Sequence, residues 1–310
     1  MRFKSPLALT TLLIASSCGS AEPRAAQAIL LESQAQDVVH REGCPERPRL
    51  GLFVWDDEGR DATLALAQAQ GITEVYLHAN LYFVGERDEA VLAAWIREAH
   101  AHCIEVELLF GNARWMQPEM RAEAVNRMQW TVDFAARHPD AQPSGVHWDL
   151  EPQQRETWSD EAAHAAIFGE FLDTLAAMRP IATSAQMPLV LDIGFFLDEM
   201  EFTREGRTRP MHEWAIDAVD RVVVMDYRDE AGPMIEMASN ELRYASEVHV
   251  PILLAVETRP IEEGEYVTFY EEGLSSLRQV LAEVRGREQN SSAFAGLAIH
   301  DRVGLEALAP

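Results

Sequence analysis

From residue 50 onward, short runs of apolar and β-branched residues alternate with longer stretches whose apolar positions recur with the period of a helix. Alternation of this kind is typical of βα units and a parallel sheet. The predicted strands cover residues 50–55, 74–78, 104–110, 145–150, 189–194, 221–225, 252–256 and 295–300. The stretches between them predict helices over residues 61–70, 88–102, 118–138, 161–178, 234–246 and 273–284.

Eight such strands predict one α/β domain, a (β/α)8 TIM barrel over residues 48–310, because this fold commonly takes about 250 residues as a single unit. Residues 198–212 are the least regular part of it, mixing Arg, Gly, Pro and Glu after the fifth strand. They predict a long loop over the barrel mouth.

The amino-terminal segment has the pattern of an export signal. Arg2 and Lys4 precede an almost wholly apolar run over residues 6–14, and small residues then lead to Cys18. The run is too short to remain as a membrane span. A cysteine at this place resembles a bacterial lipobox, so residues 1–18 are predicted to be a lipoprotein signal peptide. Acylated Cys18 would then tether the exported chain to a lipid bilayer of the cell envelope, at the outer membrane or the periplasmic face.

Residues 19–47 are rich in Ala, Gln and Glu and predict a tether with one helix, over residues 25–40, that caps the barrel floor. In an oxidising compartment Cys44 and Cys103 could form a disulfide, although the sequence does not place their Cα atoms. The 310 residues include 51 acidic and 26 basic ones, a net charge of -25, which argues against nucleic acid as a partner. Protein partners are not indicated.

Polar and aromatic residues stand at the carboxyl ends of all eight predicted strands, where the loops of a barrel surround one mouth. Such convergence predicts a binding site. Trp55 and Trp115 are the predicted sugar platforms, because sugar C–H faces stack on aromatic rings, whereas Trp148 is predicted to point outward into the helix layer. The candidate substrate-binding residues are Trp55, Asp56, His78, Asn112, Trp115, Asp192, Asp226, Arg228 and His300.

Asp149 and Glu151 are the strongest candidates for catalysis. They lie two residues apart in a strand, so both side chains point to the same face. Their mutual repulsion raises the pKa of at least one of them and suits it to donate a proton near neutral pH. Glu151, the outer one, is the predicted general acid and Asp149 its partner. Alternatively, the two carboxylates cap the next helix or pair with Arg155.

The segment over residues 144–152 resembles the fourth strand of the family 18 glycoside hydrolases, the chitinase-like barrels, which has the motif Asp-Gly-x-Asp-x-Asp-x-Glu. Gly145, Asp149 and Glu151 match it, whereas Ser144 and His147 replace two of its aspartates. The chain is also similar to uncharacterised exported bacterial barrels with a His-x-Asp-x-Glu-Pro strand.

A second correspondence with family 18 is Met225-Asp226-Tyr227, which resembles the Met-x-Tyr of the sixth strand. The resemblance implies that Tyr227 helps to hold a substrate N-acetyl group while that group attacks its own anomeric carbon. His300 stands where the family has a tryptophan, so the usual stacking floor is missing.

Glu257 indicates another mechanism. It ends the seventh strand, where the large clan of retaining glycosidases has its nucleophile, and Glu151-Pro152 resembles that clan's acid/base, although Leu150 replaces the expected Asn. Carboxyl groups about 5.5 Å apart would give a covalent intermediate, and a gap of about 6.5 to 9.5 Å would favour inversion. Alternatively, Glu257 only pairs with Arg228 or Arg259.

These observations predict an exported glycoside hydrolase that cleaves a polysaccharide or glycoconjugate, with a carbohydrate ligand and no cofactor or metal. One alternative is a carbohydrate-binding lipoprotein without turnover, because fold does not imply activity. Another is a metal-dependent hydrolase, although the His-x-His usual in the first strand of metal-dependent barrels is absent. Its candidate ligands are His78, His147, Asp149, Asp192 and His300.

Overall fold

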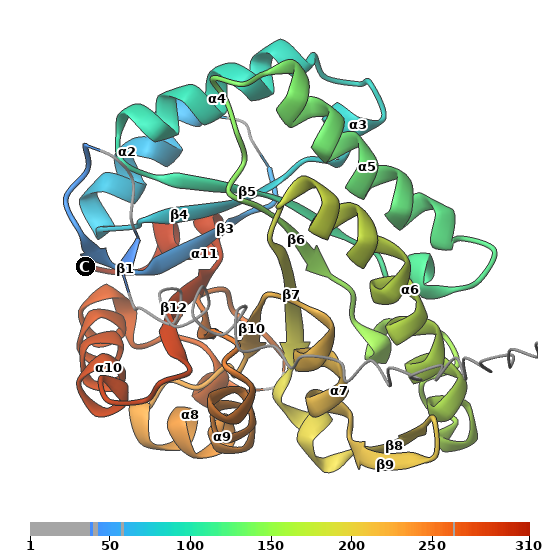
Figure 1. Ribbon diagram of the computed structural model, residues 1–310. Coiled ribbons are helices and arrows are strands. Elements are labelled where there is room, and N and C mark those ends of the chain that lie inside the picture. The colour runs from blue at the N-terminus through green and yellow to red at the C-terminus, as the bar shows by residue number, and fades with distance from the viewer. Residues whose placement is uncertain (1–37, 40–42, 57–58, 263) are drawn as a thin grey trace, which may run out of the picture.

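Eight parallel strands close into a barrel in the computed structural model, which describes residues 38–39, 43–56, 59–262 and 264–310 (Figure 1). The predicted (β/α)8 fold is therefore confirmed, and each strand lies within one residue of its predicted range. In order around the barrel, the strands are β3 (Leu50–Val54), β4 (Glu74–His78), β5 (Glu105–Gly111), β6 (Gly145–Asp149), β7 (Leu189–Gly194), β10 (Arg221–Met225), β11 (Ile252–Glu257) and β12 (Phe294–His300), which pairs with β3.

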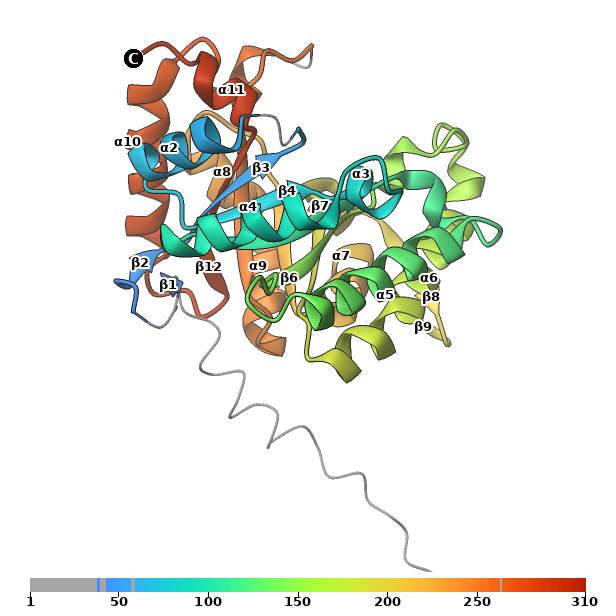
Figure 2. The ribbon, with the colours of Figure 1, turned by 90° about the horizontal axis from the view of Figure 1, so that it is seen from above.

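Helices surround the strands on the outside of the barrel (Figures 1 and 2). Helix α4 (Glu89–Ala101) illustrates how these helices form and pack. At its start the Asp88 carboxylate accepts a hydrogen bond from the Ala90 N–H, and its apolar stripe, which includes Trp95, is buried. The predicted helix over residues 234–246 is divided in two at Ala238. The α-helices are α2 (Arg60–Gln70), α3 (Asn80–Phe83), α4 (Glu89–Ala101), α5 (Arg121–Arg137), α6 (His164–Ala185), α7 (Met211–Ala218), α8 (Ala231–Met237), α9 (Ser239–Val248), α10 (Gly273–Glu288) and α11 (Arg302–Ala307).

One prediction about an irregular segment is wrong. Residues 198–212 do not form a loop but contain an antiparallel hairpin of β8 (Glu201–Arg204) and β9 (Arg207–Pro210). Glu205 and Gly206 both have positive φ, the backbone of a tight two-residue hairpin turn. The helix predicted over residues 25–40 lies mostly outside the described residues, and at its end Val38–Val39 forms strand β1, paired with β2 (Arg47–Pro48).

Alternate residues of each strand point into the barrel and out to the helices. The apolar lumen cluster includes Phe53, Tyr76 and Val223, whereas Trp148 packs into the outer core, as predicted from its parity. A Cβ atom at position 51 would lie 2.1 Å from the Tyr76 hydroxyl, so a glycine is needed there. The large lumen side chains fill the barrel up to the level at which the strands end.

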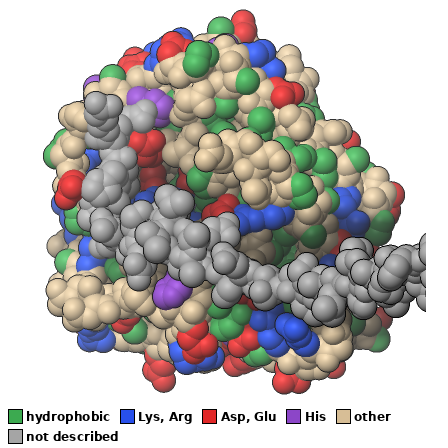
Figure 3. Space-filling view, viewed as in Figure 1, with side chains coloured by type: hydrophobic (Ala, Val, Ile, Leu, Met, Phe, Trp, Pro, Cys, Tyr) green, Lys and Arg blue, Asp and Glu red, His purple; other side chains and the backbone are tan. Residues whose placement is uncertain are grey.

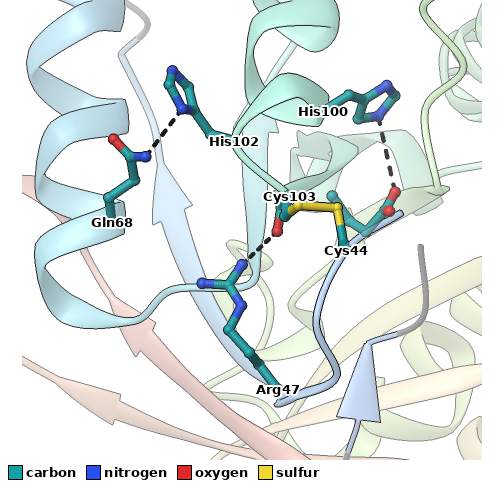
Figure 4. Close-up of a disulfide and its surroundings, with 7 residues drawn as sticks. Cys44, Arg47, Gln68, His100, His102 and Cys103 are labelled. Atoms are coloured by element: carbon teal, nitrogen blue, oxygen red, sulfur yellow. Dashed lines mark hydrogen bonds and ion pairs between the residues drawn. A yellow bond between two sulfur atoms is a disulfide. The ribbon is translucent and has the colours of Figure 1, made fainter. Parts of the chain in front are cut away.

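A disulfide joins Cys44 to Cys103, with their Cα atoms 5.7 Å apart (Figure 4). The Arg47 guanidinium donates to the Cys103 carbonyl oxygen at 2.5 Å beside it. Cys44 lies close before β3 and Cys103 close before β5, so the bond lies at the amino ends of the strands. The pairing that the sequence left open is present, and it closes a loop at the end of the barrel opposite the mouth.

Acidic side chains are interspersed with basic ones on the face of the molecule seen in Figure 3. Within the part of the chain that the structure describes, no helix is both long and apolar enough to span a bilayer. Cys18 and the predicted signal peptide lie outside the described residues.

Candidate active site

A cavity of about 320 Å³ opens at the carboxyl ends of the strands. Seven of the predicted site residues line it, from six different strands or the loops that follow them, as expected for the mouth of this fold. Phe53, Gln154 and Met225 complete the lining and were not predicted. The residues around the cavity are Phe53, Trp55, Asp149, Glu151, Gln154, Asp192, Met225, Tyr227, Glu257 and His300.

Asp149 and Glu151 both reach this cavity, because alternate residues of β6 point inward. Gly111 on the neighbouring strand makes room for Asp149: a Cβ atom there would lie 2.9 Å from the Asp149 carbonyl oxygen and 3.1 Å from Oδ2. The Gln153 amide donates to Glu151 Oε2 at 2.6 Å, and the Gln154 amide donates to Oε1. The two carboxyl groups are therefore placed by the strand and by the turn after it.

The structural alternative for these two carboxyl groups is wrong. Glu151 precedes a short 3-10 helix, Pro152–Gln154, but its side chain makes no capping hydrogen bond. Arg155 pairs instead with Glu170 at 2.5 Å.

The surroundings of Asp149 and Glu151 favour their protonated forms. Burial, the Asp192 charge and the Glu151 charge raise the pKa of Asp149 well above its usual range. Burial and the Asp192 charge raise the pKa of Glu151 to about 7, against the lowering effects of His300 and Gln154. A carboxyl group with a pKa near 7 can hold a proton at neutral pH and release it to a reacting group.

Glu257 faces the cavity with both oxygens in hydrogen bonds. Oε1 accepts from the backbone N–H groups of Thr258 and Arg259, each at 2.7 Å, and Oε2 lies 2.7 Å from His300 Nδ1. The predicted alternative pairing with the Arg228 or Arg259 side chain is wrong. Three hydrogen bonds therefore hold the Glu257 carboxyl group in place at the cavity.

His300 links Glu257 to Trp55. The Trp55 indole N–H donates to His300 Nε2 at 2.9 Å, so Nε2 must carry a lone pair and Nδ1 the proton that faces Glu257. Burial lowers the pKa of His300, but the hydrogen bond and the charge of Glu257 outweigh it and raise the pKa. The two influences compete, and protonation of His300 breaks its hydrogen bond to Trp55.

Tyr227 points into the cavity from the segment after β10. Burial raises the pKa of its hydroxyl well above the usual range, and the charges of Glu257, Asp192, Asp149 and Glu151 add to the effect. The phenol therefore keeps its proton and can donate a hydrogen bond to a ligand.

A charged network extends from the cavity down the lumen. His147 is fully buried, with Nε2 2.8 Å from Asp192 Oδ1 and Nδ1 2.9 Å from Glu107 Oε2. Arg221 pairs with Glu107 and lies 3.7 Å from Glu74, which also pairs with Arg49. His147 thus occupies the position of a family 18 aspartate but forms a hydrogen bond with Asp192 on the next strand.

Two predicted site residues after β10 lie away from the cavity. Asp226 alternates with the inward Met225 and Tyr227, so it is buried on the outer side of the barrel. Arg228 donates to the Tyr227 carbonyl oxygen and stacks over Phe195 and Tyr266. Asp226 and Arg228 thus have the outward parity, opposite to that of Met225 and Tyr227, which line the cavity.

Four more predicted residues also lie outside the cavity lining. His78 contacts Trp55, with ring centroids 5.6 Å apart, from behind. Trp115 is buried under the Arg127 guanidinium and beside Trp148, so it offers no exposed platform. Asp56 is exposed and pairs with Arg302 at 3.1 Å, and the Asn112 side chain accepts from the Arg114 N–H at the start of a short helix.

In the described ranges, no three His, Cys, Asp or Glu side chains are arranged to hold an ion. The reason is visible at the two inward histidines: His147 contacts a carboxylate with each ring nitrogen, and His300 is engaged by Glu257 and Trp55. Neither imidazole has a nitrogen available for a metal.

Outside the cavity, Asp226 and Glu241 are fully buried and their carboxyl oxygens have no hydrogen-bond partner in the structure. Burial raises the pKa of each to about 8. A carboxyl group whose pKa is raised by folding stabilises the fold below its ordinary pKa, and this contribution is lost as pH rises toward 8.

Replacing Glu241 by Gln, which cannot ionise, is therefore expected to stabilise the protein at pH 8.5 by about 2 kcal/mol or more. At pH 4 the change is expected to be much smaller. Thermal unfolding at the two pH values measures the difference, with the exposed Glu247→Gln as the control. An equal effect of Glu241→Gln at both pH values would contradict the raised pKa.

Comparison with known proteins supports the fold and goes no further. No family model and no curated protein sequence matches the chain. A chitinase from Chromobacterium violaceum is similar in structure, with a TM-score of 0.52 and 12% identity over 84% of this chain and 98% of the chitinase. A family 18 N-acetylglucosaminidase from Paenibacillus barengoltzii gives 0.51 and 13%, over 84% and 98%. A chitinase from Bacteroides thetaiotaomicron gives 0.51 and 12%, over 83% and 90%.

The likeness to the family 18 barrels is thus confirmed as a likeness of fold. The resemblance to exported bacterial lipoproteins stays a prediction.

Proposed function

We propose that this chain is an exported glycoside hydrolase that cleaves a polysaccharide or glycoconjugate, with Glu151 as general acid. One observation carries the proposal: Glu151 lies in the cavity at the mouth, beside Asp149 and Asp192, with its pKa raised to about 7. The similar structures named chitinases and an N-acetylglucosaminidase agree with a carbohydrate as the ligand.

In the proposed reaction, Glu151 gives its proton to the glycosidic oxygen while the bond from that oxygen to the anomeric carbon breaks. Water then adds its hydroxyl to the anomeric carbon and returns a proton to the site. Asp149, whose raised pKa favours its protonated form, lies next to Glu151 and is proposed to steady that carboxyl group. The half-buried Trp55 offers its ring to the sugar face.

Glu257 is the proposed nucleophile or base. Its hydrogen bonds to His300 and to two backbone N–H groups hold it at the cavity. Tyr227 is proposed to donate to the substrate. In a substrate-assisted route it would hold an N-acetyl group, and Glu257 would then serve only to orient His300 and Trp55.

The proposal is tested by incubating the protein with a panel of aryl glycosides and soluble polysaccharides, measuring released phenol or new reducing ends, with calorimetry for binding. Cleavage of one class of substrate supports the proposal. Binding without cleavage would support the alternative of a carbohydrate-binding protein without turnover, and absence of both would overturn the proposal.

We further propose that the protein acts outside the cytoplasm and is tethered through acylated Cys18. The apolar run before Cys18 and the Cys44–Cys103 disulfide, a bond favoured in oxidising compartments, support this location. Incorporation of labelled fatty acid that persists in Cys18→Ser would overturn it.

A further inference from the structure

The cavity is strongly acidic. Asp149, Glu151, Asp192 and Glu257 line it, and of its ten described lining residues none is Lys or Arg. His300 is the one basic group among these ten, and its two nitrogens already serve Glu257 and Trp55. Both oxygens of Glu151 and of Glu257 already have hydrogen-bond partners, so the buried acceptors left for a ligand are on Asp149 and Asp192.

Of the four carboxyl groups, Asp192 gives the clearest indication of the ligand that the cavity binds. It is 1% exposed, and its Oδ1 is held by His147 at 2.8 Å, whereas its Oδ2 is buried and has no hydrogen-bond partner in the structure. Asp149 Oδ1 is buried and unpartnered in the same way. A buried carboxylate oxygen without a donor costs free energy, which a ligand that brings a cationic donor recovers.

His147 makes this arrangement rigid. Glu107 holds its other nitrogen, and Glu107 is itself paired with Arg221, so the imidazole cannot turn away from Asp192. Asp192 lines the cavity, and with Oδ1 held by His147 its second oxygen remains the acceptor for a ligand. A charged donor at this place would meet a preformed acceptor and would not have to reorder it.

From this geometry we infer that the cavity binds a sugar with a free, protonated amino group, whose ammonium is held by Asp192 Oδ2 with Asp149 beside it. This rests on the proposed function and names its substrate class: a polymer or oligomer of de-N-acetylated amino sugars. An N-acetylated sugar would instead bring one uncharged N–H donor and a carbonyl acceptor to these carboxyl oxygens, in place of the charge and three donors of an ammonium.

The inference also decides between substrate-assisted cleavage and a route through Glu257. A free ammonium has no acetyl oxygen with which to attack the anomeric carbon, so a substrate of this class cannot assist its own cleavage. Glu257 would then take the part of nucleophile, or of base for an attacking water.

The test is calorimetric binding of the full chain to hexosamine oligomers, each compared in its de-N-acetylated and N-acetylated form below the pKa of the amine, with neutral glucan oligomers as a third set. We expect the de-N-acetylated form to bind at least ~10-fold more tightly than both others. Asp192→Asn is expected to reduce this preference to within ~2-fold.

A control is needed because a chain of net charge -25 attracts any polycation. Asp56→Asn removes an exposed carboxylate outside the cavity and is expected to leave the preference unchanged. Equal or tighter binding of the N-acetylated form by the parent protein would overturn the inference, whether or not the variants fold, and so would a preference that survives in folded Asp192→Asn. Preferential cleavage of N-acetylated or neutral glycans would overturn it while upholding the proposed hydrolase.

Discussion

Replacing Glu151 by Gln is expected to lower kcat on any cleaved glycoside by at least ~100-fold while leaving the dissociation constant within ~3-fold. Gln keeps the size of the side chain and can still meet Gln153 and Gln154, but it has no proton to give. A positioned proton donor commonly contributes at least this factor. Because the pKa of Glu151 is raised to about 7 and the protonated form is the active one, kcat/KM is also expected to fall as pH rises above about 7.

Glu156→Gln is the matched control, since Glu156 is exposed and lies five residues further along the chain. It removes the same charge near the mouth without touching the cavity. Steady-state kinetics from pH 4 to pH 9, with calorimetry on the inactive variant, measures both effects. If Glu151→Gln kept more than about a tenth of the parent activity, another group would have to be the acid.

The largest loss of stability is expected from Arg221→Met. Arg221 lies at the bottom of the lumen between Glu107 and Glu74, both 1% exposed. Burial raises the pKa of Glu74, but the charges of Arg49 and Arg221 outweigh it and hold the pKa below its usual value. Removing one partner from a buried network leaves uncompensated charge and commonly costs about 3–5 kcal/mol.

For a domain of this size such a loss lowers Tm by at least about 6 °C. Arg243→Met removes an exposed arginine that pairs with Glu247 on a helix, and we expect it to cost no more than about 0.5 kcal/mol. Thermal and urea unfolding compare the two. Equal melting temperatures would mean that Glu107 and Glu74 accommodate the loss by taking up protons, and the network would then not be a source of stability.

The strands and most of the catalytic candidates were predictable because barrel strands are buried on both faces. Their apolar runs are distinct, and the residues directly after each run must lie at the mouth. Asp226 shows the limit of this reasoning: it directly follows a strand but has the outward parity, whereas Glu257 at the end of its strand faces the cavity. Counting alternation from Tyr227 would have excluded Asp226.

The lumen network was predictable only in part. Glu74 and Glu107 have the inward parity of Tyr76 and Leu109 on their own strands, a signal available in the sequence. Arg49 pairs with Glu74 on a neighbouring strand, whereas the pairing of Arg221 with Glu107 joins strands on different sides of the barrel, and no local pattern encodes it. The prediction that Trp115 is a sugar platform was wrong for a similar reason. Arg127, from the following helix, covers the Trp115 ring, and the local sequence does not indicate this contact.

The Cys44–Cys103 bond fixes the side of the barrel at which the amino-terminal part of the chain joins it. It fastens the chain just after residue 43 to the floor, at the amino ends of the strands, whereas Glu151 and Glu257 stand at the roof. Any anchor placed ahead of residue 43, be it a lipid, a fusion partner or the resin of a column, therefore holds the barrel from below. A long polymer could pass across the roof without meeting the support, so an immobilised preparation should keep an unobstructed mouth.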